Sequence, residues 1–281
     1  MTRHVAVIGH PVAHSRSPLI HGYWIAEHGI DGTYDRRDVP PEEIAGFLAN
    51  FAAGDLVGAN VTVPHKEAAF AAAVERDPVA EALGAVNTLW LEEGRLYGAN
   101  TDVHGFLANL DAAAPEWDRA LDEAVVLGAG GAARAIVYGL IGRGIGRVTV
   151  ANRTLSRAEA LRAQFGDKVL PVDWRDLAGT LPSARLLVNT TSLGMKGQPP
   201  LDIDLSLLSP DAVVTDAVYV PLETPLLRAA RARGLAAVDG LGMLLHQAVP
   251  GFARWFGVAP QVTPALRALA VEDLRVKGQL A

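Results

Sequence analysis

The stretch that decides the fold is Val125-Val126-Leu127-Gly128-Ala129-Gly130-Gly131-Ala132-Ala133-Arg134-Ala135. An apolar run ends in glycines and continues into small residues, which is typical of a strand, a tight turn and the start of a helix. Gly128 permits the turn, Gly130 lets backbone N–H groups approach a pyrophosphate, and Ala133 lets helix and strand pack closely. The pattern predicts a dinucleotide-binding unit with phosphates at a helix N-terminus; an ordinary tight turn is the alternative.

The following strand points to the type of dinucleotide. Residues 147–151 predict a second parallel strand, which ends in Asn152-Arg153-Thr154-Leu155-Ser156-Arg157. An NAD site usually has an acidic residue here, whereas Arg153 and Arg157 offer guanidinium groups that suit a 2′-phosphate. A solvated helix start with Thr154 as its N-cap explains the same residues without a ligand. The glycine turn and the basic strand end together predict NADP.

Composition bounds the class of protein. The chain has 281 residues, of which 50% are hydrophobic and 20% charged, so we expect a globular protein with room for two domains. A net charge of -6 argues against a nucleic-acid partner. The absence of cysteine excludes disulfides, thiolate nucleophiles and cysteine-ligated zinc, and we expect no metal site. The N-terminus leads directly into a strand pattern, and no apolar run is long enough for a membrane span, so a cytoplasmic enzyme is expected.

The order of elements predicts an α/β fold with two domains. In the second half, strands at 124–128, 146–151, 185–189, 212–217 and 235–238 alternate with helices at 131–142, 155–165 and 223–233. Such alternation is typical of a doubly wound parallel sheet of the Rossmann type. Two further helices follow Gly240 with no strand between them, so we expect them to return to the first domain. The predicted domains are 1–102 plus 241–281, and an inserted NADP-binding domain, 103–240.

Polar residues follow strands of the first domain, where open α/β sheets bind ligands. Ser15 and Ser17 follow the strand at 4–9, and Ser17 is also a candidate N-cap for a helix that opens at Pro18. Thr62 lies near the end of the strand predicted at 56–64, and Lys66 follows that strand, so both belong to this edge. Capping for the serines and an exposed helix position for Lys66 are the alternatives without a ligand.

The chain closely resembles the shikimate dehydrogenase family, NADP-dependent enzymes that interconvert shikimate and 3-dehydroshikimate. The resemblance covers nearly the whole chain. It rests on motifs in a fixed order, which are 9–18 (GHPVAHSRSP), 58–67 (GANVTVPHKE), 84–88 (GAVNT), 100–102 (NTD), 128–132 (GAGGA), 152–157 (NRTLSR), 216–219 (DAVY) and 240–248 (GLGMLLHQA). At position 65 the chain has histidine, where the family often has phenylalanine or another apolar residue.

The resemblance implies a role for each matching residue. Lys66 resembles the catalytic lysine, paired with Asp102, which could also cap the helix that follows it. Substrate contacts are implied for Ser15, Ser17, Tyr219 and Thr62 around a carboxylate, and for Asn87, Asp102 and Gln247 at ring hydroxyls. Cofactor contacts are implied for Gly128, Ala129, Gly130, Gly131 and Ala132 at the pyrophosphate, for Asn152, Arg153, Thr154 and Arg157 at the 2′-phosphate, and for Ala217, Gly240 and Met243 at the nicotinamide.

We expect Lys66 to be cationic in the free enzyme and to donate a proton to the ketone, with Asp102 orienting it. A quinate/shikimate dehydrogenase of broader specificity and a non-catalytic NADP-binding protein of the same fold are the alternatives. A short-chain dehydrogenase is excluded because no tyrosine belongs to a Tyr-x-x-x-Lys pattern. The expected partner is a small-molecule substrate, without nucleic acid or membrane, and the expected state is a monomer or homodimer.

Overall fold

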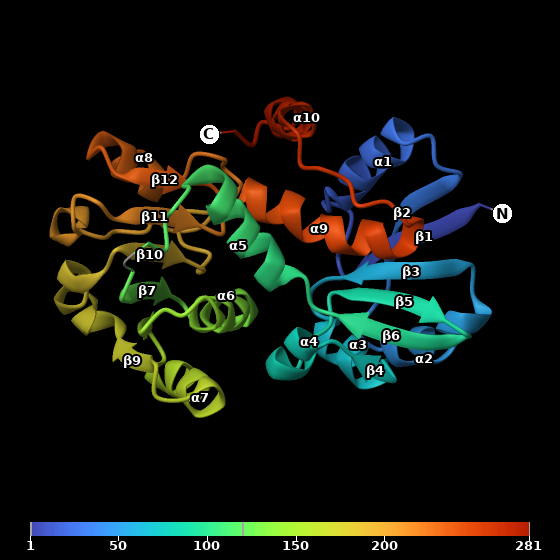
Figure 1. Cartoon of the computed structure of the whole chain (residues 1–281), viewed down its shortest axis with the longest axis horizontal. Coiled ribbons are helices and arrows are strands. Elements are labelled where there is room, and N and C mark those ends of the chain that lie inside the picture. The colour runs from blue at the N-terminus through green and yellow to red at the C-terminus, as the bar shows by residue number, and fades with distance from the viewer. Residues whose placement is uncertain (1, 120, 281) are drawn as a thin grey trace. The chain divides into compact units, whose positions relative to one another are not determined.

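The structure is a computed structural model that describes residues 2–119 and 121–280. It forms two compact units (Figure 1). The first unit comprises the residues up to Asp102 together with Leu245–Ala270, and the second comprises Val103–Leu244 together with the residues from Val271 onward. Among the described residues, no helix is both long enough and apolar enough to cross a membrane.

The first unit is built on a six-stranded sheet of order β2-β1-β3-β5-β6-β4. Strand β1 pairs in parallel with both β2 and β3, so the carboxyl ends of these three strands lie at one edge. The elements are β1 (Arg3–Gly9), α1 (Ser17–Glu27), β2 (Gly32–Asp38), α2 (Ile44–Ala49), η1 (Phe51–Ala53), β3 (Leu56–Val61), α3 (Lys66–Ala72), β4 (Glu75–Arg76), α4 (Pro78–Leu83), β5 (Thr88–Glu92) and β6 (Arg95–Ala99).

Apolar side chains cover this sheet. Ile8 and Val61 pack with residues of α2 and α3 in a single buried cluster. Elsewhere in the unit, the buried rings of His21 and Trp24 on α1 contact Phe252, which lies on α9 (Leu241–Phe256). Helix α9 therefore covers part of the first unit, although it comes from the far end of the sequence.

Several predicted element ends in this unit are wrong. Ser17 is the first residue of α1 instead of its N-cap; Arg16 takes that position, and no side chain caps the helix. The strand predicted at 56–64 ends at Val61. A short helix, α4, lies between β4 and β5. Asp77 caps α4 by accepting a hydrogen bond from Ala80, and the left-handed backbone of Gly84 (φ 63°) ends the helix.

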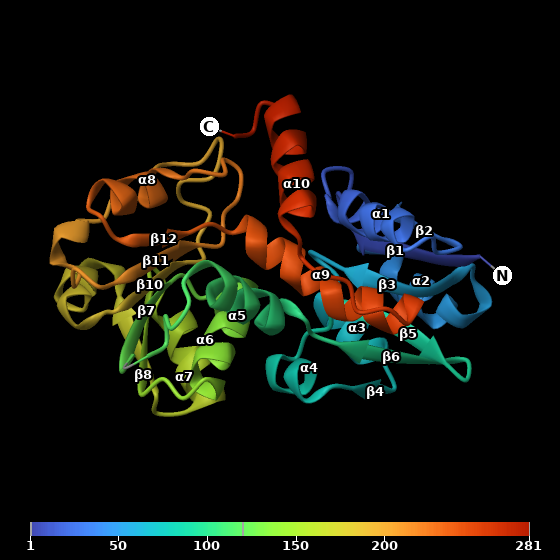
Figure 2. The same cartoon turned by 45° about the horizontal axis from the view of Figure 1, so that its top comes forward.

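The second unit is a Rossmann-type domain. Its six strands lie in the order β12-β11-β10-β7-β8-β9, and every pair is parallel. Figure 2 shows the succession from β12 through β11, β10 and β7 to β8. The elements are α5 (Asp102–Ala113), β7 (Glu123–Leu127), α6 (Gly131–Gly142), β8 (Arg147–Asn152), α7 (Leu155–Phe165), β9 (Val169–Asp173), η2 (Trp174–Gly179), η3 (Leu181–Ser183), β10 (Leu186–Asn189), η4 (Leu205–Leu207), β11 (Val213–Asp216), α8 (Pro225–Ala232) and β12 (Ala236–Val238). The last helix, α10 (Pro264–Val276), is divided between the units, since its residues up to Ala270 group with the first unit and those from Val271 with the second.

The central strands of this sheet are continuous apolar runs in the sequence, and the surroundings of β7 show why. Val126 belongs to a buried cluster that contains residues of α5, α6 and α7. Val125 and Leu127 belong to a second cluster that contains residues of η2, η3 and α8. Because both faces of the strand are covered, all four side chains from Ala124 to Leu127 are buried, as is usual for parallel sheets.

Two features of the second unit differ from the prediction. Strand β9 is additional; it contains Pro171 and lies at the sheet edge, where a missing N–H is tolerated. The division of the chain also differs, since residues 241–244 and 271–280 group with the second unit. Met243 packs against its core, and the Lys196 ammonium donates a hydrogen bond to the carbonyl of Gly278.

Candidate functional site

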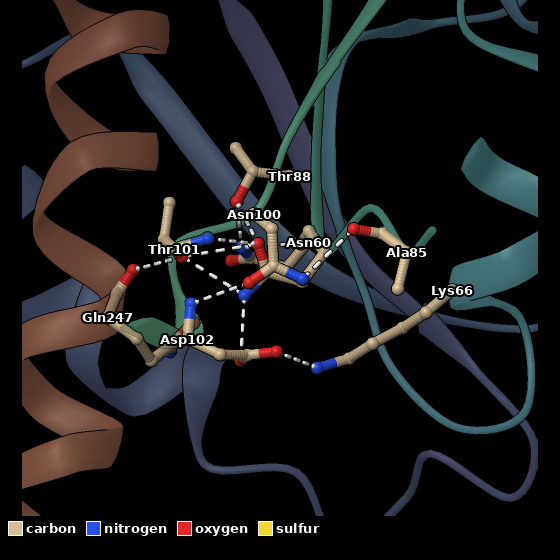
Figure 3. A network of polar contacts seen from close by, with 9 residues as sticks. Asn60, Lys66, Ala85, Thr88, Asn100, Thr101, Asp102 and Gln247 are labelled. Carbon is tan, nitrogen blue, oxygen red and sulfur yellow. Dashed lines mark hydrogen bonds and ion pairs between the residues drawn. The ribbon is translucent and has the colours of Figure 1, made fainter. Parts of the chain in front are cut away.

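An ammonium and a carboxylate meet at the start of two helices. Lys66 is the first residue of α3 and Asp102 is the first residue of α5. Figure 3 shows the Lys66 side chain pointing toward Asp102. The Lys66 Nζ atom donates to Asp102 Oδ2 at 2.5 Å, and the two side chains are 28% and 18% exposed. The pair is therefore largely shielded but still reachable from solvent. The structure brings together the two residues that the sequence predicted as catalytic.

Asn87 holds the carboxylate from its other side. Its Nδ2 atom donates to Asp102 Oδ1 at 2.9 Å and to Thr101 Oγ1 at 3.0 Å. Figure 3 shows Thr101 beside Gln247. The Thr101 hydroxyl donates to the backbone carbonyl of Gln247 at 2.8 Å, so it must accept from Asn87. This fixes which end of the Asn87 amide is nitrogen. Both amide hydrogens are engaged, and the residue is only 3% exposed.

A buried polar network lies behind Asn87. Asn60 donates through Nδ2 to the Asn87 carbonyl at 3.2 Å and to Thr88 Oγ1 at 3.3 Å, while its Oδ1 accepts from the Tyr34 hydroxyl at 2.6 Å. Thr88 in turn donates to Asn87 Oδ1 at 3.0 Å. No role for Asn60, Thr88 or Tyr34 follows from the sequence. The signal that could have found Asn60 is an amide in an otherwise apolar strand.

Ser15 and Ser17 lie close together where the loop after β1 meets α1. Ser15 Oγ donates to Ser17 Oγ at 3.3 Å, and the Ser17 N–H donates to Ser15 Oγ at 3.3 Å. The Arg36 guanidinium donates to the Ser15 carbonyl at 2.6 and 3.2 Å and so fixes the loop on β2. Thr62 lies at the base of this loop, because a Cβ built on Gly9 would lie 2.5 Å from its Cγ2.

His65 is a structural residue beside the predicted catalytic lysine. It is 2% exposed, and its Nε2 atom lies 2.7 Å from the Val39 carbonyl oxygen. A carbonyl oxygen only accepts, so Nε2 carries the hydrogen. His65 therefore ties the start of α3 to the segment that follows β2.

The glycine turn of the second unit has the geometry that a phosphate needs. Gly128 has φ +98°, and a Cβ there would lie 2.8 Å from Thr190 Oγ1, so glycine is required. Helix α6 begins at Gly131 with no side-chain cap and no acidic residue in its first turn. A Cβ at Gly130 or Gly131 would meet nothing within 4 Å. The turn, with Ala129 and Ala132 beside it, leaves the start of α6 uncapped and open, which fits the pyrophosphate of a dinucleotide.

The end of β8 has the predicted basic character. Arg153 and Arg157 are exposed, and within residues 2–119 and 121–280 neither guanidinium has an ion-pair or hydrogen-bond partner. Asn152 shapes the turn by donating to the Thr154 carbonyl at 2.8 Å. Thr154 occupies the N-cap position of α7, but its side chain makes no capping hydrogen bond. These residues fit a 2′-phosphate better than a ribose hydroxyl.

Ala217, Gly240 and Met243 also belong to the second unit, as does Tyr219. A Cβ on Gly240 would lie 2.5 Å from the carbonyl oxygen of Ala217, so these two backbone segments are in close contact. The neighbouring Asp216 is fully buried, and burial raises the pKa of its carboxyl group to about 6. No group of three or more potential ligands that could hold a metal occurs among the described residues.

Three family descriptions match the chain. They are the shikimate dehydrogenase substrate binding domain (residues 7–89), shikimate / quinate 5-dehydrogenase (residues 113–194) and the shikimate 5′-dehydrogenase C-terminal domain (residues 240–270). The first match contains Lys66 and Asn87, and the second contains the glycine turn and the basic end of β8.

Individual relatives match over nearly their whole length. A protein of Azorhizobium caulinodans named shikimate dehydrogenase (NADP(+)) is 64% identical, with 99% of each chain covered. The shikimate 5-dehydrogenase of Thermus thermophilus, solved with NADP(H) and shikimate, is 39% identical with a TM-score of 0.85, covering 96% of this chain and 99% of that one. The quinate dehydrogenase of Corynebacterium glutamicum, solved with NAD, is 33% identical with a TM-score of 0.89 and the same coverage. The chain belongs to the shikimate dehydrogenase family.

Proposed function

We propose that this chain is an NADP-dependent oxidoreductase that interconverts 3-dehydroshikimate and shikimate, a step of chorismate and aromatic amino-acid biosynthesis. The observation that carries the proposal is the Lys66–Asp102 pair, held by Asn87 within a chain whose relatives are named for this reaction. A lysine is needed because the reaction moves a proton onto or off the substrate oxygen. When bound, NADP would supply or accept a hydride, which is one proton with two electrons, at the substrate carbon.

Lys66 is the group that moves the proton. In the direction of reduction, its ammonium donates a hydrogen bond to the carbonyl oxygen and transfers the proton as negative charge develops there. In the direction of oxidation, the neutral amine accepts the hydroxyl proton. Asp102 keeps Nζ in place throughout, because its second oxygen is bound to Asn87.

The remaining residues of the first unit would recognise the substrate. Ser15, Ser17 and Thr62, together with Tyr219 of the second unit, would bind the carboxylate. Asn87, Asp102 and Gln247 would bind the ring hydroxyls. Because both amide hydrogens of Asn87 are engaged, its contact with the substrate would replace one of the bonds that it makes here. A substrate that lacks a hydroxyl would leave a buried group unpaired, which gives specificity.

The second unit would bind the cofactor. Gly128, Ala129, Gly130, Gly131 and Ala132 would hold the pyrophosphate. Asn152, Arg153, Thr154 and Arg157 would hold the 2′-phosphate, and Ala217, Gly240 and Met243 would contact the nicotinamide. The first unit is accordingly the substrate domain and the second the NADP domain.

The direct test is to incubate the purified protein with shikimate and NADP⁺ and to follow the absorbance of reduced cofactor. We expect turnover with shikimate, and little with NADP⁺ alone. A protein that binds NADP⁺ but does not oxidise shikimate would be the non-catalytic alternative, and the proposal would be wrong.

A broader quinate/shikimate dehydrogenase is the second candidate, because the quinate dehydrogenase of Corynebacterium glutamicum shares the fold. Quinate carries an extra hydroxyl at the carbon that bears the carboxylate, so it needs more room near Ser15 and Ser17. Steady-state kinetics with both acids and both cofactors distinguish the candidates. The exposed Arg153 and Arg157 favour NADP, and we expect kcat/KM to be highest for shikimate with NADP⁺.

The proposed setting is the cytoplasm, with a monomer or homodimer as the working form. Cell fractionation followed by the shikimate assay tests the location. Light scattering on the purified chain tests the oligomeric state.

A further inference from the structure

The ends of β10 and β11 meet at one buried carboxylate. Asp216, the last residue of β11, has no exposed surface. Its Oδ1 atom accepts from Asn189 Nδ2 at 2.9 Å and from the Val218 N–H at 3.0 Å, while Oδ2 accepts from the Thr224 hydroxyl at 2.7 Å. The carboxylate therefore joins the end of β10, the loop after β11 and the start of α8.

Asn189 extends this arrangement to a second loop. Its Nδ2 atom also donates to the Leu193 carbonyl at 3.2 Å, and its Oδ1 accepts from the Thr191 N–H at 3.0 Å and from the Thr191 hydroxyl at 2.7 Å. The Ala217 N–H donates to the Asn189 backbone carbonyl at 2.9 Å. One pair of buried side chains thus fixes both residues 190–194 and residues 217–224.

Thr224 shows why a carboxylate is needed at position 216. Thr224 is the N-cap of α8, and its Oγ1 accepts from the Leu227 N–H at 3.3 Å. Its single hydroxyl hydrogen is therefore available for Asp216 Oδ2, which must be an acceptor. An amide nitrogen in place of Oδ2 would remove this acceptor and leave the Thr224 hydroxyl hydrogen without its present partner.

The carboxylate is held without a cation. Within the described part of the chain, no ion pair involves Asp216; Arg228 and Arg231 on the adjacent α8 bind Glu223 instead, and the Lys196 ammonium binds a backbone carbonyl. Burying an unpaired carboxylate costs stability even when it is hydrogen-bonded. Such a cost is expected where the geometry of a functional segment depends on the group.

We propose that Asp216 is a positioning residue for the nicotinamide half of NADP, acting by fixing the loop that carries Ala217 and Tyr219. The contact between Gly240 and the Ala217 carbonyl shows that this loop also sets the position of a second predicted nicotinamide residue. The proposal rests on the proposed function, because it concerns how that cofactor is aligned. It assigns Asp216 no contact with the cofactor or the substrate.

The test compares the whole cofactor with its adenosine half in the variant Asp216→Asn. We expect the KM for NADP⁺ to rise about tenfold and kcat to fall by a similar factor, because a charge-assisted hydrogen bond is lost. In the proposed binding mode, adenosine 2′,5′-bisphosphate would contact only the glycine turn and the residues around Arg153. Its inhibition constant against NADP⁺ should therefore stay within about twofold of the wild-type value, since no hydrogen bond of its own is changed.

Glu223→Gln is the matched control, because it neutralises a carboxylate of the same loop that is only half-buried and binds Arg228 and Arg231. It should leave all three constants unchanged. Thr224→Val should reproduce the effect of Asp216→Asn, and Thr224→Ser should keep the wild-type constants, because serine retains the hydroxyl.

Two outcomes overturn the inference. One is an Asp216→Asn enzyme with wild-type KM and kcat. The other is equal weakening of NADP⁺ and of adenosine 2′,5′-bisphosphate, which would mean a general disturbance of the second unit. Failure of the wild-type chain to oxidise shikimate would instead contradict the proposed function, and a titration of NADPH fluorescence would still measure the effect of the substitution on binding.

Discussion

The Nζ atom of Lys66 lies 2.5 Å from Oδ2 of Asp102, and the other oxygen of that carboxylate accepts a hydrogen bond from Asn87. Both oxygens of Asp102 are thus committed, and the side chain has little freedom to move away. The position of the ammonium follows from that of the carboxylate. Lys66 and Asp102 lie in the first turns of two different helices, and they are 36 residues apart in the chain.

Replacing Lys66 should remove the proton step. Lys66→Ala is expected to lower kcat by about 10²–10⁴-fold with a much smaller change in the KM for shikimate, the usual range for a general acid or base. Lys66→Arg should be almost as inactive, because a guanidinium keeps the charge but does not release a proton. Lys277→Ala is the control, since that lysine is exposed and pairs with Asp273. Wild-type kcat in either Lys66 variant would remove this residue from the mechanism.

Replacing Arg153 or Arg157 should affect NADP⁺ selectively. Each change to alanine is expected to raise the KM for NADP⁺ about tenfold, the value of a lost charge-assisted hydrogen bond, and to leave the KM for NAD⁺ nearly unchanged. The effect should shrink at high salt, because both side chains are exposed. Arg162→Ala on α7 is the control, since that guanidinium pairs with Asp167. An equal loss for both cofactors would contradict the assignment.

The sequence predicts best where one local pattern is sufficient. The glycine turn at Gly128 and the basic strand end at Arg153 each depend on a few adjacent residues, and both occur where they are expected. Edge strand β9 escapes prediction because Pro171 is unfavourable in most strands, and only its place at the sheet edge makes it tolerable. Helix ends are also hard to place, as at Ser17, because several residues near a helix start are suitable caps.

The orienting residues cannot be predicted from local patterns. The amide orientation of Asn87 depends on Thr101, which in turn depends on a carbonyl 146 residues further along the chain. Asp216 stands out only as part of a family motif, because nothing in its neighbours reveals that Thr224 and Asn189 converge on it. Such partners are defined by the tertiary structure alone.

The substitution His65→Phe should separate stability from activity. The histidine ring is buried and donates to the Val39 carbonyl, so the change leaves a buried acceptor unpaired. We expect the free energy of unfolding to fall by about 1–3 kcal/mol in urea titrations. The kcat should stay near the wild-type value, because the imidazole takes no part in the proposed proton step. A large fall in kcat with unchanged stability would mean that His65 acts on the reaction itself.

The buried His21 should make the first unit sensitive to mild acid. Its ring stacks on the Tyr34 ring, with the ring centroids 4.0 Å apart. Burial lowers the pKa of the imidazole from 6.5 to about 3, and the nearby Asn60 side chain opposes this shift only in part. The unfolded chain therefore binds a proton at this histidine below about pH 6.5, whereas the folded chain does not. The contribution of His21 to the free energy of unfolding is at its maximum above that pH. As the pH falls, this contribution decreases by up to about 1.4 kcal/mol per pH unit.

The variant His21→Phe tests this, because phenylalanine keeps an aromatic ring against Tyr34 and does not titrate. Between about pH 7.5 and 5.5, its free energy of unfolding in urea should change by roughly 1 kcal/mol less than that of the wild type.

Asp216→Asn should act in the opposite direction. Burial raises the pKa of Asp216 from 3.8 to about 6, so its stabilising contribution is present at low pH and is lost as the pH rises through that value. If both variants kept the wild-type pH dependence, neither buried group would titrate as the structure implies.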